Sequence, residues 1–138
     1  MAYKVKYKER NALAWELKRA IKDLGLVDTW SMYDSVRISL EVDENNGDMQ
    51  CIINVMYYYF FQDEGTIHLA PQKITNKWFK RPKVQEIFLQ VYADFIDWYA
   101  NKYDLLKVPK KLEKLKDRPK VYIDFNWLGG KDIPSYMK

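Results

Sequence analysis

The sequence predicts a single α+β domain: an N-terminal helix, a three-stranded antiparallel meander, a long amphipathic helix packed on the sheet and a C-terminal strand. Two patterns support this. Residues 9–24 and 84–105 repeat apolar side chains at the helical period, whereas residues 36–42 alternate apolar and polar side chains. In addition, 138 residues with 48% hydrophobic content suffice to bury one core. We therefore expect residues 1–138 to form one globular domain with short N- and C-terminal extensions.

The first helix is expected from Glu9 to Leu24, with Gly25 ending it. On the side opposite its apolar stripe, an indole lies beside three cations. Such a cluster is typical of a cation–π pair, a stacking platform for nucleic-acid bases or an interface anchor. Alternatively, the indole packs under the N-terminal segment Tyr3–Tyr7. The residues of this cluster are Trp15, Lys18, Arg19 and Lys22.

The meander begins with a strand over Val36–Val42, followed by Asn46-Gly47, a strong hairpin-turn signal. The returning strand is expected from Met49 to Phe61. Both of its faces are largely apolar, which predicts either a central strand covered on both sides or an exposed contact surface. A third short strand is expected over Thr66–Ala70, ended by Pro71.

The second helix is expected from Val84 to Leu105. It is apolar over more than half of its circumference, and a helix of this kind is usually buried on two sides. We therefore expect a homodimer in which one side belongs to a second subunit. A helical turn around Lys110–Lys116, a strand over Val121–Phe125 and a turn at Gly129-Gly130 should follow. The predicted dimer contacts are Phe88, Phe95, Trp98 and Tyr99.

Charge is arranged in blocks along the chain. Residues 23–70 contain nine acidic side chains against one base, whereas residues 1–22, 71–83 and 107–120 each carry a net charge of +5. The acidic block coincides with the predicted hairpin, so its carboxylates could imitate a phosphate backbone and fill a cationic groove of another protein. An ordinary solvated turn is the alternative. The candidate protein-binding residues are Glu41, Asp43, Glu44, Asp48, Asp63 and Glu64.

The basic block at residues 71–83 interleaves cations with aromatic rings. This pattern suits phosphate contact combined with base stacking in a nucleic-acid-binding protein. The alternative is a surface loop in which Trp78 and Phe79 fill the core while the lysines are solvated. The candidate nucleic-acid-binding residues of this block are Lys73, Lys77, Trp78, Lys80, Arg81 and Lys83.

Catalytic and cofactor signatures are lacking in the sequence. Cys51 and His68 are the only cysteine and the only histidine, so no intrachain disulfide can form and no zinc-ligand spacing is present. We expect a reducing, cytoplasmic environment, no membrane span, no metal and no cofactor. A small metal-dependent nuclease is a remote alternative. Asp34, Glu41 and Asp124 lie near strands, but no Glu-x-Lys triplet accompanies them.

These observations favour a non-catalytic binding protein. In size and charge layout the chain is similar to the small accessory proteins of phages and mobile elements, including anti-CRISPR and other anti-defence proteins. That similarity implies a host partner, namely a nucleic-acid-processing effector whose groove is occupied by a nucleic-acid mimic. The alternative function is a nucleic-acid-binding module that uses residues 71–83, with the Trp15 cluster or residues 107–120 in support.

Overall fold

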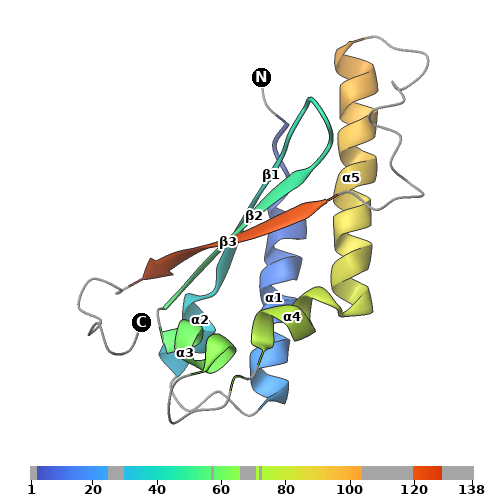
Figure 1. Cartoon of the computed structure of the whole chain (residues 1–138). Helices are drawn as coiled ribbons and strands as arrows, with labels where there is room; N and C mark the ends of the chain where they lie inside the picture. The colour runs from blue at the N-terminus through green and yellow to red at the C-terminus, as the bar shows by residue number, and fades with distance from the viewer. Residues whose placement is uncertain are drawn as a thin grey trace.

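A computed structural model describes residues 3–24, 30–56, 58–65, 71, 73–103 and 120–128. It contains helices and a three-stranded mixed sheet, which confirms the predicted α+β class (Figure 1). In chain order the elements are α1 (Tyr7–Asp23), α2 (Trp30–Ser35), β1 (Arg37–Val42), β2 (Met49–Met56), α3 (Tyr58–Glu64), α4 (Ile74–Phe79), α5 (Pro82–Lys102) and β3 (Val121–Leu128).

The sheet has the order β1-β2-β3, with β2 in the centre. β1 and β2 form the expected antiparallel hairpin, in which Leu40 lies opposite Cys51. The other neighbour of β2 is the C-terminal strand β3, which runs parallel to it and places Ile123 beside Cys51. The sheet is therefore mixed rather than purely antiparallel, and β3 continues three residues beyond the predicted Phe125. The predicted strand Thr66–Ala70 lies outside the described residues.

One face of the sheet is buried beneath the helices and the other is open. Alternate residues of β1 and β2 point into the core, where they meet the apolar stripes of α1 and α5. The intervening residues of β2 are only half-buried. β2 is therefore a central strand, but within the described residues helices cover only one of its faces and not both, as one prediction had it. The alternative, that the other face is a contact surface, stays a prediction.

The returning strand was predicted to run to Phe61, and this is wrong because β2 ends at Met56 and α3 begins at Tyr58. Beyond β1 the strand has no antiparallel neighbour, and the backbone N–H of Met56 donates instead to the Ser35 hydroxyl at 3.2 Å. The Tyr59 side chain then fills the core without exposed surface. A continuous apolar run does not distinguish a strand from a buried helix, which explains the error.

α5 is the predicted long amphipathic helix, but its apolar face packs within its own chain. Phe88 and Phe95 are 3% and 0% exposed, so neither is accessible to a second subunit. Tyr3 packs edge-on against Phe95 and also contacts the half-buried Trp98. Phe88 and Phe95 are therefore not available as dimer contacts, which corrects the prediction for these two residues. Trp98 and Tyr99 are half-buried, and the homodimer itself stays a prediction.

Candidate protein-binding surface

The β1–β2 turn is built by its own polar side chains. The Asp43 carboxylate accepts the backbone N–H of Asn45 at 2.8 Å, and the Asn46 side-chain oxygen accepts the N–H of Asp48 at 2.9 Å. Backbone bonds of 2.8 Å join Asp43 to Asp48 and to Gly47. These bonds satisfy the turn locally, so its shape is defined before any partner binds.

Two contacts hold the turn against α5. Gly47 has a positive φ of 76°, and a Cβ at this position would lie 2.7 Å from Cε1 of Tyr92. Glu44 forms an ion pair of 3.5 Å with Lys102 near the end of α5. Glu44 therefore contributes to an intramolecular contact, unlike the exposed Glu41 and Asp43 of the same acidic set.

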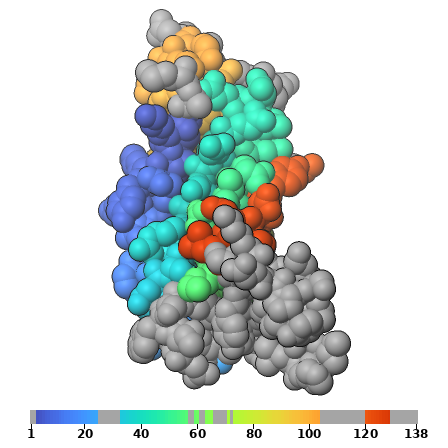
Figure 2. Space-filling view, turned by 90° about the vertical axis from the view of Figure 1, so that its left-hand side faces the viewer, coloured from blue at the N-terminus to red at the C-terminus, as the bar shows by residue number. Residues whose placement is uncertain are grey.

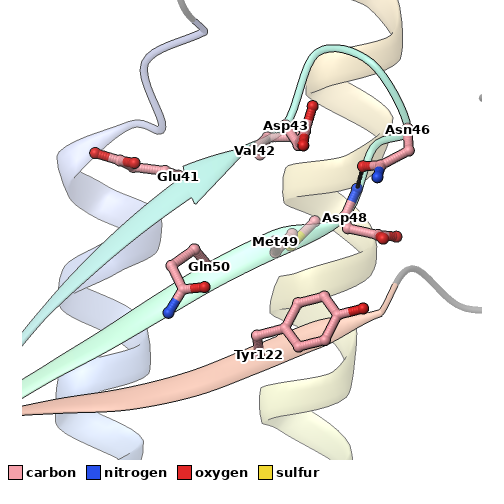
Figure 3. Close-up of a pocket in the computed structure, with 8 residues that line it drawn as sticks. All are labelled: Glu41, Val42, Asp43, Asn46, Asp48, Met49, Gln50 and Tyr122. Atoms are coloured by element: carbon pink, nitrogen blue, oxygen red, sulfur yellow. Dashed lines mark hydrogen bonds between the residues drawn. The ribbon is translucent and has the colours of Figure 1, made fainter.

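A hollow of about 500 Å³ lies beside this turn at the end of the sheet (Figure 3). Three carboxylates from β1 and the turn surround it, and the phenol ring of Tyr122 from β3 lies below Gln50 and Asp48 in this view. The hollow is thus assembled from all three strands. The residues that line it are Glu41, Val42, Asp43, Asn46, Asp48, Met49, Gln50 and Tyr122.

The hollow continues onto the open face of the sheet. Half-buried apolar and amide side chains of β2 lie between β1 and the exposed Asp124 and Asn126 of β3. Tyr122 and Leu128 of β3 also lie on this face and are 51% and 41% exposed. Arg37 is the single base among the strand residues of this face, and its guanidinium donates to the backbone carbonyls of residues 34 and 36. This surface is called the acidic sheet face below. Its residues are Glu41, Asp43, Asp48, Gln50, Tyr122, Asp124, Asn126 and Leu128.

The other two predicted acidic residues lie elsewhere. Asp63 is 6% exposed, and its carboxylate accepts both the N–H and the hydroxyl of Thr75 at 2.9 Å. It therefore stabilises the first turn of α4 and cannot serve a partner, which corrects the prediction for this residue. Glu64 is exposed at the end of α3, where it lines a separate hollow with Lys73 and Phe125.

The predicted basic and aromatic segment is divided between core and surface. Trp78 has no exposed surface and its indole N–H donates to the Leu13 carbonyl at 3.1 Å, so the prediction that it stacks on a base is wrong. Arg81 pairs with Glu16 at 3.1 Å and with Asp23 at 3.2 Å. The remaining bases of this segment are exposed, namely Lys73, Lys77, Lys80 and Lys83.

The Trp15 cluster lies on the surface of α1. Trp15 is 47% exposed, and the Lys18 ammonium lies 4.7 Å from the centre of its ring. The proposed packing of Trp15 under the N-terminal segment is therefore wrong, and the cation–π pair is present. Lys22 is exposed, whereas Arg19 binds the buried Glu16 at 3.0 Å.

Comparison with known proteins gives no match. No family model fits the sequence, and no curated protein or solved structure is significantly similar to it.

Within the described ranges, no group of three or more His, Cys, Asp and Glu side chains is placed to hold a metal ion. No described helix is long and apolar enough to cross a membrane. Cys51 is buried, and burial raises the pKa of its thiol to about 12, which disfavours the reactive thiolate. His68 lies outside the described residues.

A second polar cluster, which the sequence did not indicate, lies between α1 and α5. Glu9 is 8% exposed, and neither of its carboxylate oxygens nor the hydroxyl of Tyr3 has a hydrogen-bond partner in the described structure. Burial, together with the neighbouring Asp94, raises the pKa of Glu9 to about 7. Burial and the same two acids raise the pKa of Tyr3 to about 12. Both groups are thus neutral over the acidic range, and Glu9 can then donate to Asp94.

Sequence reasoning missed Tyr122 and Asp124 as members of the acidic sheet face. The alternation in residues 121–125 was visible and predicts that these two side chains share one face. Their position next to Gln50 and Ile52 depends on the parallel pairing of β3 with β2, across more than 60 intervening residues. No local pattern specifies that pairing.

Proposed function

We propose that this protein is a non-catalytic binding protein whose acidic sheet face occupies a cationic surface of another protein. The main observation in support is that four carboxylates share one side of the sheet with exposed apolar side chains. They are Glu41, Asp43, Asp48 and Asp124. Carboxylates around an apolar centre give electrostatic complementarity to a basic groove and also apolar area to bury. A row of carboxylates can replace the phosphates that such a groove normally binds.

Three features support a role in recognition rather than a merely solvated turn. The turn is fixed by local hydrogen bonds and by Gly47 against Tyr92, so little ordering accompanies binding. The Tyr122 ring is large and half-exposed, as is common for interface anchors. The similarity of the chain in size and charge layout to anti-defence proteins points to a nucleic-acid-processing host effector as the partner.

The test is capture of a partner from a bacterial lysate by the immobilised protein and by two matched variants. In the first variant Glu41, Asp43 and Asp48 are changed to Lys. In the control variant three exposed acids outside the sheet are changed to Lys, namely Glu64, Glu86 and Asp97. Both variants change the net charge equally. Loss of capture in the first variant alone supports the proposal, and equal capture by both variants refutes it.

A second candidate function, nucleic-acid binding, is favoured by one observation. Trp15 remains exposed beside Lys18, and α4, which packs on α1, presents Lys77 and Lys80 to solvent. A stacking ring next to exposed cations suits single-stranded nucleic acid. Retardation of DNA or RNA at low salt, lost on Trp15→Ala, would favour this function over the acidic sheet face. Absence of retardation at low salt would exclude it.

A further inference from the structure

The N-terminal segment, residues 3–6, lies against two elements that come much later in the chain. Tyr3 packs on two aromatic rings of α5, and Val5 is buried. Lys4 forms an isolated antiparallel bridge with Glu41 of β1. Figure 2 shows the start of the described chain, in dark blue, at the surface beside the hairpin and below the end of α5, in orange. Since α1 also begins without a side-chain hydrogen bond at its N-cap, this peripheral segment can open locally while the core stays folded.

Two acidic side chains lie together next to this segment, Glu9 of α1 and Asp94 of α5. Both carboxylate oxygens of Glu9 are enclosed and have no hydrogen-bond partner among the described residues, and the same holds for the Tyr3 hydroxyl. Asp94 differs, because it accepts the Gln90 amide at 2.9 Å and lies 3.7 Å from the Lys6 ammonium. A buried carboxylate without a partner is costly, whereas a protonated carboxyl can donate to Asp94. The closed arrangement is therefore stable with a proton on Glu9.

The bases near Glu9 do not compensate its negative charge. Among the described residues no Lys or Arg forms an ion pair with it, and Lys6 pairs with Asp94 instead. Burial and Asp94 raise the pKa of Glu9 to about 7, although Lys6 acts in the opposite direction. Ionisation therefore places a second negative charge beside Asp94 at a position enclosed from water. The other charged residues of the cleft that Glu9 lines are exposed, namely Lys8, Lys83 and Glu86.

We propose that residues 3–6 form a strap that is closed over α5 while Glu9 is protonated and that opens when Glu9 ionises. Opening brings water to the Glu9 carboxylate, so the charge is no longer buried. It also uncovers the two aromatic rings of α5 on which Tyr3 packs, and the outer side of β1 at Glu41. The strap thus controls access to an aromatic part of α5 and to the border of the acidic sheet face. This inference does not depend on the proposed function.

The direction of the pH effect follows from which state holds the proton. The closed state keeps it up to about pH 7, whereas in the open state Glu9 ionises near its ordinary pKa of 4.5. Closing is therefore fully favoured below about pH 4.5 and weakens by roughly tenfold per pH unit as pH rises to about 7. Above this pH both states are ionised, and no further change is expected.

Thiol labelling at residue 5 measures opening of the strap. Cys51→Ala removes the only natural thiol, and Val5→Cys then introduces one at a position that is 7% exposed. Its labelling rate, divided by the rate of the urea-unfolded chain at the same pH, should rise by roughly 100-fold from pH 5 to pH 7. Adding Glu9→Gln should hold the rate at its pH 5 level, because the amide cannot ionise. Adding Glu86→Gln, at an exposed position of the same cleft, is the control and should leave the rise unchanged.

Cys51 of the unmodified protein, which is 0% exposed, reports global unfolding in the same assay. Low urea should accelerate labelling of Cys51 but not of the strap, because local opening exposes little surface. Three results overturn the proposal: a strap thiol labelled no faster than Cys51, a rise that survives Glu9→Gln, or unprotected labelling at pH 5. Should Val5→Cys not fold, fluorine NMR of a label on the Tyr3 ring decides. Its resonance should move toward that of a solvent-exposed ring from pH 5 to pH 7, and an unchanged resonance refutes the strap.

Discussion

Glu9→Gln is expected to remove most of the fall in stability that this protein should show between about pH 4.5 and pH 7. The Glu9 carboxyl is 8% exposed between α1 and α5, and its oxygens have no partner among the described residues. Asp94 of α5 and Tyr3 face it, and Lys6 lies 3.7 Å from the Asp94 carboxylate. Burial is the main factor that disfavours the charged form of Glu9. The neighbouring Asp94 disfavours it further, because like charges repel.

The pKa of Glu9 rises from an ordinary 4.5 to about 7, so the native state retains a proton that the unfolded state has lost. The stabilisation is therefore complete below about pH 4.5 and is lost as pH rises through about 7. Since one pH unit corresponds to about 1.4 kcal/mol, the free energy of unfolding should fall by about 3 kcal/mol over this interval. Gln is neutral throughout and can donate to Asp94, so the variant should be the more stable protein at pH 8.

Urea unfolding followed by tryptophan fluorescence at half-unit steps from pH 4 to 8 measures this effect. The difference in free energy of unfolding between Glu9→Gln and the unmodified protein should be near zero at pH 4. It should reach about 2–3 kcal/mol in favour of the variant at pH 8. The control is Glu86→Gln, which changes an exposed acid of α5 in the cleft that Glu9 also lines, between α1 and α5. It should leave the pH dependence of the free energy of unfolding unchanged. A difference that is constant with pH would refute a buried, protonated Glu9.

Two further substitutions test the packing of the candidate surfaces. Gly47→Ala should destabilise the protein by about 1–3 kcal/mol in chemical denaturation, because its φ of 76° disfavours a Cβ and that atom would collide with Tyr92. If instead the melting temperature is unchanged, the turn does not rest on α5. Trp78→Ala should lower the free energy of unfolding by about 3–5 kcal/mol, because it leaves a cavity in the core. Lys77→Ala, at an exposed position next to it, is the control and should change the free energy of unfolding by less than about 0.5 kcal/mol. Equal effects of the two would contradict the buried position of the indole.

The local patterns of the sequence predict the two long helices and the β1–β2 hairpin, but they do not predict the short helices α2, α3 and α4. α1 and α5 match their apolar periodicity, and the hairpin follows the Asn46-Gly47 signal, because these features depend on neighbouring residues alone. The end of β2 could not be predicted, since the aromatic residues that open Tyr58–Glu64 continue the apolar run of the strand, and tertiary packing rather than propensity makes them helical.

The same difference between local and tertiary structure explains which candidate site residues were predicted correctly. Glu41, Asp43 and Asp48 lie together because they belong to one hairpin, and a hairpin is a local structure. Asp63 and Trp78 were misplaced because their burial depends on partners elsewhere in the chain, Thr75 for one and Leu13 for the other. Charge and aromaticity identify residues suited to binding, but only the tertiary structure separates those that bind within the chain from those that face solvent.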